Sequence, residues 1–148
     1  MMFATMNPST YGGTHELNKD FKNRYTQINW TYPNTEQEFR ILEHEGIPDK
    51  IVKGVCQLGM ELRAAEAAGD IDDSPSPRTN QMFCDSYREY LKNERICAMQ
   101  KGNGALHYAL KHNILNEFSM PNQKDLVAKR IQRIFGINID SGYTSDDD

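Results

Sequence analysis

Three side chains in this sequence have types suited to phosphoryl transfer: Asn7, Arg24 and Arg78. Transfer of a phosphoryl group to water needs little covalent chemistry from a protein, which must position the water and stabilise charge on the transferred group. A neutral amide can position a water without competing as a nucleophile. Arginine suits phosphate oxygens because it has a permanent charge and a planar fork of donors. The elements that would hold these three residues decide whether they can act together.

Asn7 follows a short apolar segment, Met1 to Thr5, for which the sequence predicts a strand. Pro8 would end that strand, because proline has no amide hydrogen to donate to a ladder. Ligands of open α/β sheets bind at the carboxyl ends of strands, so an amide at this point is placed for catalysis. The same Asn-Pro pair also fits an ordinary turn after a strand.

Arg24 lies between two predicted elements. The first is a helix from Thr14 to about Asn23, with Leu17 and Phe21 four residues apart on one face. The second is a strand from Tyr25 to Tyr32, which alternates and is rich in aromatic and β-branched residues. An arginine at such a junction can project toward the γ-phosphate of a neighbouring subunit. A solvated surface arginine fits the same position.

Arg78 follows a loop of Gly, Asp, Ser and Pro residues and opens a predicted helix from Pro77 to Leu91. Backbone amides at a helix N-terminus favour anions, and a neighbouring cation sharpens the preference for phosphate. Ser76-Pro77-Arg78 also reads as a plain capping sequence with an arginine of no special role.

Most of the remaining chain has helical periodicity. Thr35 and Glu38 are predicted to form a capping box, with Phe39 and Leu42 on the buried side of that helix. The other predicted helices cover about residues 48–68, 94–100, 105–118 and 122–135.

The predicted fold class is therefore mainly α with a short N-terminal β portion. Residues 1–34 would form the β-containing part, residues 35–140 a helical domain, and residues 141–148 a disordered acidic tail. A pair of strands is marginal in water, so these two would need a sheet to join.

The composition excludes several classes of function. The net charge of −4 over 148 residues, with no long basic run, argues against a dedicated nucleic-acid face. No segment approaches the roughly 18 apolar residues of a membrane span, and no secretory signal is found, so a cytoplasmic location is expected. Cys56, Cys84 and Cys97 are isolated, as buried thiols of a reduced compartment are. No metal site is predicted, because His107 and His112 are five residues apart.

The order of these motifs resembles the second half of the nucleotide-binding core of AAA+ ATPases of the MoxR and cobaltochelatase-small-subunit kind. The segments that carry the resemblance are Ala4-Thr-Met-Asn-Pro8, Tyr11-Gly-Gly-Thr14, Leu17, Asn23-Arg24-Tyr25 and Ser76-Pro77-Arg78. It is strongest over about residues 3–42 and 76–91, and the last fifty residues fit as generic lid helices. It implies a partial P-loop NTPase α/β core, of two strands and a helix, followed by a helical AAA+ lid bundle.

The resemblance also implies roles for the three residues. Asn7 would be the sensor-1 residue, Arg24 the finger acting on a neighbouring subunit, and Arg78 the sensor-2 residue acting on its own subunit's γ-phosphate. Family members commonly have Asp-Arg-Phe where this chain has Asn23-Arg24-Tyr25. The implied partners are other AAA+ subunits in a ring and a von Willebrand-type domain protein.

The chain departs from the family in lacking the Walker A and Walker B motifs. There is no G-x-x-x-x-G-K-[ST] phosphate loop and no apolar strand ending in Asp-Glu to anchor Mg²⁺. The family places both before the strand that begins this chain, so Met1 and Met2 would be an internal start, a product of a split gene or a mispredicted start. ATP and Mg²⁺ belong to the complete ATPase, and neither is expected to bind tightly to this chain alone or to support hydrolysis by it.

The leading interpretation is a fragment of an AAA+ ATPase that couples ATP hydrolysis to remodelling of a protein partner or to metal insertion. The alternative is a small helical adaptor that binds a protein partner without nucleotide. A third interpretation, a nucleic-acid binder, would use the basic side of the last helix, which carries Lys124, Lys129, Arg130 and Arg133.

Overall fold

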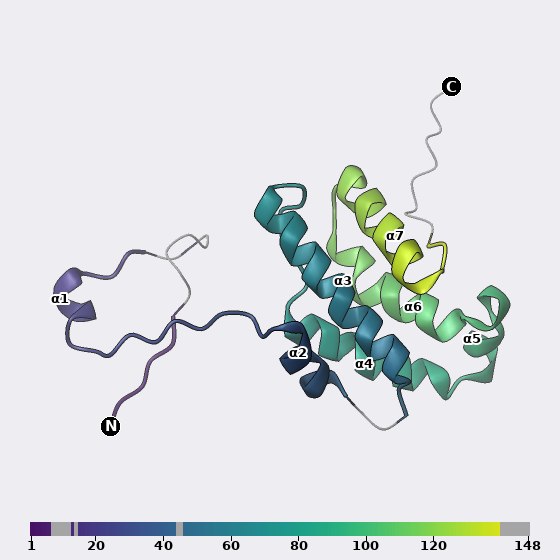
Figure 1. Ribbon diagram of the computed structural model, residues 1–148, viewed down its shortest axis with the longest axis horizontal. Coiled ribbons are helices and arrows are strands. Elements are labelled where there is room, and N and C mark those ends of the chain that lie inside the picture. Colours follow the sequence, from purple (N-terminus) through teal and green to yellow (C-terminus); the bar gives the residue numbers. More distant parts are fainter. Residues whose placement is uncertain (7–12, 14, 44–45, 140–148) are drawn as a thin grey trace. The chain divides into compact units, whose positions relative to one another are not determined.

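The structure is a computed structural model of the chain and describes residues 1–6, 13, 15–43 and 46–139. The chain divides into two compact units, residues 1–31 and residues 32–148. We call them the N-terminal unit and the helical unit. Figure 1 labels the helices of both along the chain.

Regular structure in the N-terminal unit is limited to one short helix, α1 (Lys19–Lys22), among its described residues. Asn18 caps it, since its Oδ1 accepts a hydrogen bond from the backbone amide of Asp20 at 3.0 Å. The rings of Phe21 and Tyr25 lie 5.2 Å apart. Residues 15–18 of the predicted helix lie outside α1, and Thr14, its predicted cap, is not among the described residues.

The predicted β portion is wrong. The described part of the chain contains no strand, and both Met1–Thr5 and Tyr25–Tyr32 lack regular structure. The partial P-loop α/β core of two strands is therefore not formed. The physical reason is that a strand is stabilised by a neighbouring ladder and by a covered face, and a lone two-stranded unit supplies neither in water. The side chain of Trp30 accordingly remains 89% exposed.

The helical unit consists of six α-helices and two short 3₁₀ turns within its described residues. They are α2 (Thr35–Leu42), α3 (Asp49–Ala68), α4 (Pro77–Leu91), α5 (Glu94–Ala98), η1 (Gln100–Gly102), α6 (Gly104–Asn113), η2 (Leu115–Glu117) and α7 (Pro121–Phe135). The predicted helices over residues 48–68 and 77–91 are confirmed. Gly69 ends α3 in the left-handed region at φ 82°, which glycine adopts without strain.

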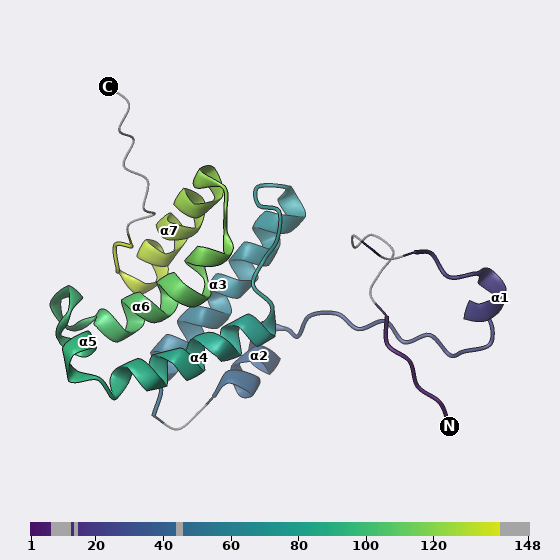
Figure 2. The ribbon, with the colours of Figure 1, turned by 180° about the vertical axis from the view of Figure 1, so that it is seen from behind.

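Two pairs of roughly antiparallel helices form most of the unit, as Figures 1 and 2 show from opposite sides. One pair is α4 with α6, and the other is α3 with α7, while α2 packs on α3 and α4. Their apolar faces form one core. Fully buried residues from all four longer helices include Leu58, Phe83, Leu110 and Ile131.

Two boundaries differ from the prediction. The helix expected over 94–100 ends at Ala98, and the 3₁₀ turn η1 comes after it. The helix expected over 105–118 ends at Asn113, and a 3₁₀ turn, η2, follows it. The Asn113 side chain donates from Nδ2 to the carbonyl of Ala109 at 2.9 Å, a local bond that competes with continuing the helix. Such side-chain bonds are hard to anticipate from apolar periodicity alone.

Candidate functional site

Arg78 lies in the first turn of α4 and is exposed to solvent. Ser76 caps this helix, because its Oγ accepts a hydrogen bond from the amide of Thr79 at 3.2 Å. Pro77 occupies the first helical position, where its missing amide hydrogen costs nothing. The Arg78 guanidinium has no hydrogen bond or ion pair with any described residue. It is thus available to an anion, on a helix whose start is well defined.

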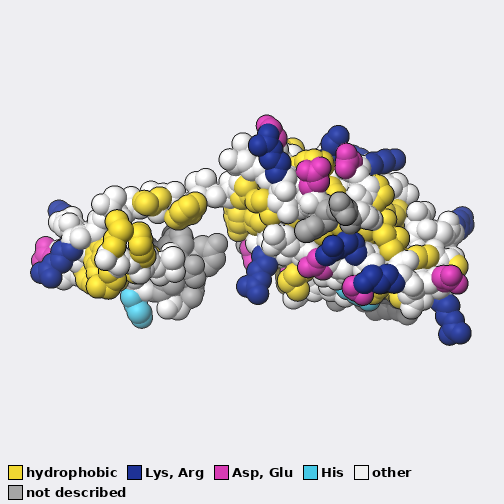
Figure 3. All heavy atoms as spheres, turned by 90° about the horizontal axis from the view of Figure 1, so that it is seen from below, with side chains coloured by type: hydrophobic (Ala, Val, Ile, Leu, Met, Phe, Trp, Pro, Cys, Tyr) yellow, Lys and Arg dark blue, Asp and Glu magenta, His cyan; other side chains and the backbone are white. Residues whose placement is uncertain are grey.

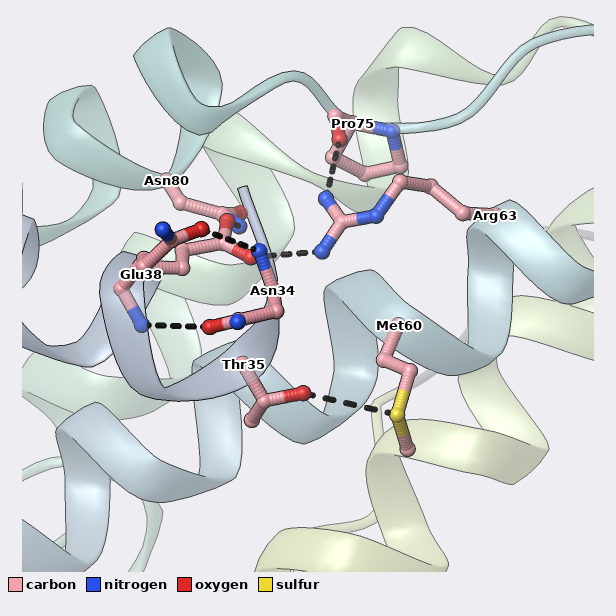
Figure 4. A network of polar contacts seen from close by, with 8 residues as sticks. Asn34, Thr35, Glu38, Met60, Arg63, Pro75 and Asn80 are labelled. Carbon is pink, nitrogen blue, oxygen red and sulfur yellow. Dashed lines mark hydrogen bonds and ion pairs between the residues drawn. The ribbon is translucent and has the colours of Figure 1, made fainter. Parts of the chain in front are cut away.

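A buried ionic network holds the start of this helix. Glu38 of α2 is fully buried, and its Oε2 lies 2.5 Å from Nη2 of Arg63 on α3. Its other oxygen, Oε1, accepts a hydrogen bond from Nδ2 of Asn80 on α4 at 2.7 Å. Nη1 of Arg63 also donates to the carbonyl of Pro75, just before the cap, at 3.4 Å. Figure 4 shows these groups converging from three helices and one loop.

The network satisfies the charge that it buries. A carboxylate without solvent is tolerated only when it is paired and hydrogen-bonded, and Glu38 has both a guanidinium and an amide as donors. The Oδ1 atom of Asn80 has no hydrogen-bond partner among the described residues. Because another packing of these helices would leave the Glu38 charge buried without its donors, the network favours the observed arrangement of α2, α3 and α4.

Sequence reasoning missed this network. It assigned Glu38 to a capping box with Thr35, whereas the box forms one residue earlier. Asn34 Oδ1 accepts from the Gln37 amide at 2.8 Å, and Gln37 Oε1 accepts from the Asn34 amide at 3.1 Å. One signal was available: Glu38 precedes the buried Leu42 by four residues and so shares its face of α2. Nothing in the sequence pattern pairs it with Arg63 or Asn80.

The other two predicted site residues belong to the first part of the chain. Arg24 lies just after α1 and is exposed, and its backbone amide donates to the carbonyl of Phe21 at 3.2 Å. Its guanidinium makes no hydrogen bond or ion pair with the residues that the structure describes. Asn7 lies outside the described residues. Arg24 and Arg78 belong to different units, so the structure defines the surroundings of each separately.

An acidic cavity of about 210 Å³ lies in the helical unit, between the loop after α3 and the start of α7. Asp72, Asp73 and Glu117 line it, and Asp72 Oδ2 accepts a hydrogen bond from Gln123 Nε2 at 2.9 Å. Burial raises the pKa of Glu117, and the nearby Asp73 adds to the rise against a hydrogen bond from Thr79. Within the described ranges, no group of three or more His, Cys, Asp and Glu side chains is arranged to hold a metal ion.

Two cysteines and one histidine are buried among the described residues of the helical unit. Cys56 and Cys84 are buried, as predicted, and burial raises the pKa of their thiols to about 12 and about 11. Cys97 is half-buried. His112 Nδ1 lies 2.9 Å from the hydroxyl of Tyr90. Burial lowers the pKa of His107, and the charges of Lys111 and His112 lower it further.

The basic side of α7 is largely engaged within the unit. Arg130 Nη1 lies 3.2 Å from Glu61 Oε2, and Arg133 pairs with the same oxygen. Lys129 pairs with Asp125 at 2.7 Å. These cations are partly neutralised by neighbouring carboxylates, which weakens the case for a phosphate-backbone surface on this helix.

Two further observations complete the description. No protein-family profile matches this chain, and no match was found among the curated proteins or the solved structures. A lipid bilayer could not be crossed by any helix in the described part of the chain, because none is both sufficiently apolar and sufficiently long.

Proposed function

We propose that this chain is the arginine-bearing and lid-containing part of an ATPase resembling the MoxR branch of AAA+ proteins. In this proposal it works together with polypeptide that carries a phosphate loop and a Mg²⁺-binding carboxylate. The assembly would couple ATP binding and hydrolysis to the remodelling of a protein partner or to the insertion of a metal. ATP and Mg²⁺ would be bound mainly by the partner polypeptide.

The observation that carries the proposal is the exposed guanidinium of Arg78 on a helix start that is fixed from within. Ser76 caps the helix, and the Glu38–Asn80 hydrogen bond of 2.7 Å anchors its first turns to α2. Because the backbone that carries Arg78 is fixed, only the side chain itself must lose freedom when it meets a phosphate, which favours transition-state stabilisation over loose attraction. Arg78 would act on the nucleotide of its own subunit.

The N-terminal unit supports the need for a partner. Its exposed apolar side chains are of a kind that a folded protein normally covers, and Figure 3 shows such side chains on its surface. They include Phe3, Leu17, Phe21, Tyr25, Ile28 and Trp30. We propose that the polypeptide carrying the phosphate loop covers them. Arg24 would then face a neighbouring subunit's γ-phosphate, and Asn7 would position the attacking water.

The test is reconstitution of hydrolysis. The chain is mixed with the phosphate-loop part of a MoxR-type ATPase, and phosphate release is measured with and without each component. We expect no hydrolysis by this chain alone and activity in the mixture. Arg24→Ala should lower the rate about 10³-fold, the lower end of the range for arginine fingers. Arg78→Ala should lower it as well.

A matched control is Arg40→Ala, which removes an exposed arginine of α2 that pairs with the exposed Glu36. It should leave hydrolysis unchanged. A mixture that is insensitive to Arg24→Ala and Arg78→Ala would defeat the proposal. The proposal would also be defeated if this chain alone hydrolysed ATP and lost that activity on Arg24→Ala.

The second candidate function is a helical adaptor that binds a protein partner without nucleotide. It is favoured by one observation, the lack of any strand in the described part of the chain. Deletion of residues 1–8 separates the two functions. An adaptor that uses the helical unit would keep its partner after this deletion, whereas the ATPase assembly would lose hydrolysis because Asn7 is removed.

A further inference from the structure

We propose that Arg63 is a positioning residue, whose guanidinium fixes the start of α4, and with it Arg78, to Tyr32, the first residue of the helical unit. The inference rests on the proposed function, since it takes Arg78 as the residue that meets a phosphate. Its physical content, a fixed helix start, can be measured without nucleotide.

The guanidinium of Arg63 contacts three separate segments. Nη2 pairs with Glu38 of α2 at 2.5 Å, and Nη1 donates to the Pro75 carbonyl in the loop before α4 at 3.4 Å. Cζ lies 5.4 Å from the centre of the Tyr32 ring, a cation–π distance. Figure 4 shows the guanidinium with one nitrogen toward Glu38 and another toward Pro75.

This set of contacts needs an arginine. The guanidinium offers donors in two directions within one plane and leaves its face for an aromatic ring. The ammonium of a lysine could keep the charge beside Glu38, but it could not also reach the Pro75 carbonyl and stack on Tyr32 in a fixed geometry. A substitution that keeps the charge therefore separates the ion pair from the positioning contacts.

The first turns of α4 are held from both sides of the Ser76 cap. Pro75, directly before the cap, accepts from Arg63, and Asn80, four residues after it, donates to Glu38. Arg78 lies between these two anchors. Gly59 of α3 leaves room for them, since a Cβ there would lie 3.0 Å from Asn80 Nδ2 and 3.3 Å from Arg63 Nη1.

A second arginine–glutamate set on the same helix provides a control. Glu61 of α3 pairs with Arg130 and Arg133 and so ties α3 to α7. Arg130 Nη1 lies 3.2 Å from Glu61 Oε2. Loss of the Glu61–Arg130 pair should loosen the packing of α7 and leave the start of α4 in place.

The experiment is amide hydrogen exchange of the full chain, comparing Arg63→Lys with Arg130→Lys. The reporting amides are those of Thr79 and Asn80, which bond to the Oγ and the carbonyl of Ser76. Arg63→Lys should raise exchange at these two amides about tenfold, as expected for loss of one hydrogen bond, while α7 is unchanged. Arg130→Lys should leave them unchanged. Equal exchange in all three proteins, or a uniform rise along the whole chain in Arg63→Lys, would overturn the proposal.

A second variant guards against misfolding. The double change Glu38→Gln with Arg63→Met removes both buried charges together, so no carboxylate is left unpaired, while Gln can still accept from Asn80. Its circular dichroism should match the unchanged protein, and exchange at Thr79 and Asn80 should rise as in Arg63→Lys. Full protection at both amides in this variant would refute a positioning role for Arg63.

Hydrolysis by the reconstituted mixture then tests the link to Arg78. Arg63→Lys should lower the rate, and adding it to Arg78→Ala should lower the rate no further, because both changes act on one guanidinium. Additive losses would overturn the link between Arg63 and Arg78. If amide hydrogen exchange responds as expected but Arg78→Ala does not change the rate of hydrolysis, the proposed function fails and the structural role of Arg63 stands.

Discussion

The two units differ in how far they bury the same types of apolar residue. Ile28 is 70% exposed in the N-terminal unit, whereas Ile131 of α7 is fully buried in the helical unit. Helical periodicity lets a chain cover its own apolar side chains, since successive helices bring complementary stripes together. The alternating pattern around Ile28 finds no such cover among the described residues of its own unit. The helical unit therefore buries its own apolar side chains, whereas the N-terminal unit leaves its apolar side chains exposed.

The largest effect is expected from breaking the buried ion pair of the helical unit. Arg63→Met leaves the Glu38 carboxylate buried beside an apolar side chain, with Asn80 as its only remaining donor. Removing one partner of a buried pair costs about 3–5 kcal/mol. Urea unfolding followed by circular dichroism should show this loss of free energy. A loss below about 1 kcal/mol would mean that the Glu38 carboxylate reaches water at little cost.

The next prediction compares one substitution in both units. Ile131→Ala should lower the free energy of unfolding by about 2–5 kcal/mol, because it opens a cavity in the core. Ile28→Ala, the matched control, should change it by less than about 0.5 kcal/mol, because that side chain is already solvated. Similar losses for the two variants would show that residue 28 packs against the helical unit, and would remove the distinction on which the need for a partner rests.

Much of the helical unit could be predicted from local signals. Pro48 and Gly69 bracket α3, and Ser76-Pro77 begins α4, where sequence reasoning placed them. These signals are local because a cap or a left-handed glycine acts within one turn of the chain. The strands could not be predicted in the same way. Whether an alternating segment forms a strand depends on a neighbouring backbone, and the described chain does not supply one.

The candidate site was predictable only in part. Arg78 was placed at a helix start from its tripeptide, and the structure has it there. Arg63 and Asn80 gave no signal, because their partner Glu38 is 25 and 42 residues away. A buried ion pair is chosen by tertiary packing, and neither helical periodicity nor capping chemistry distinguishes a buried glutamate from an exposed one.

A smaller effect is expected from pH, and it concerns the helical unit alone. The folded state lowers the pKa of His107 below its ordinary value of 6.5 through burial, then through Lys111 and His112. The unfolded chain therefore binds a proton first as pH falls, and stability contributed by neutral His107 is present above pH 6.5 and lost below it. His107→Gln should flatten this part of the profile, measured by urea unfolding at several pH values.

The control for this prediction is His112→Gln, the same change at an exposed histidine one turn further along the chain. It should leave most of the decline below pH 6.5 in place, with only the small part due to its charge removed. If His112→Gln flattens the profile and His107→Gln does not, the decline belongs to the surface histidine and the assignment to burial is wrong.

The smallest expected effect is on the fluorescence of Trp30, which we predict does not change when the helices unfold. This absence of change is the sharpest test of the difference between the two units. Trp30 is the sole tryptophan of the sequence, so tryptophan fluorescence reports on the N-terminal unit while circular dichroism reports on the helices. Its side chain is 89% exposed, and its emission should already be that of a solvated indole before urea is added. The emission should therefore not follow the unfolding transition seen by circular dichroism. Coincident transitions would mean that the indole packs on the helical unit. A blue shift on adding the phosphate-loop polypeptide, with the dichroism unchanged, would show directly that a second molecule covers this segment.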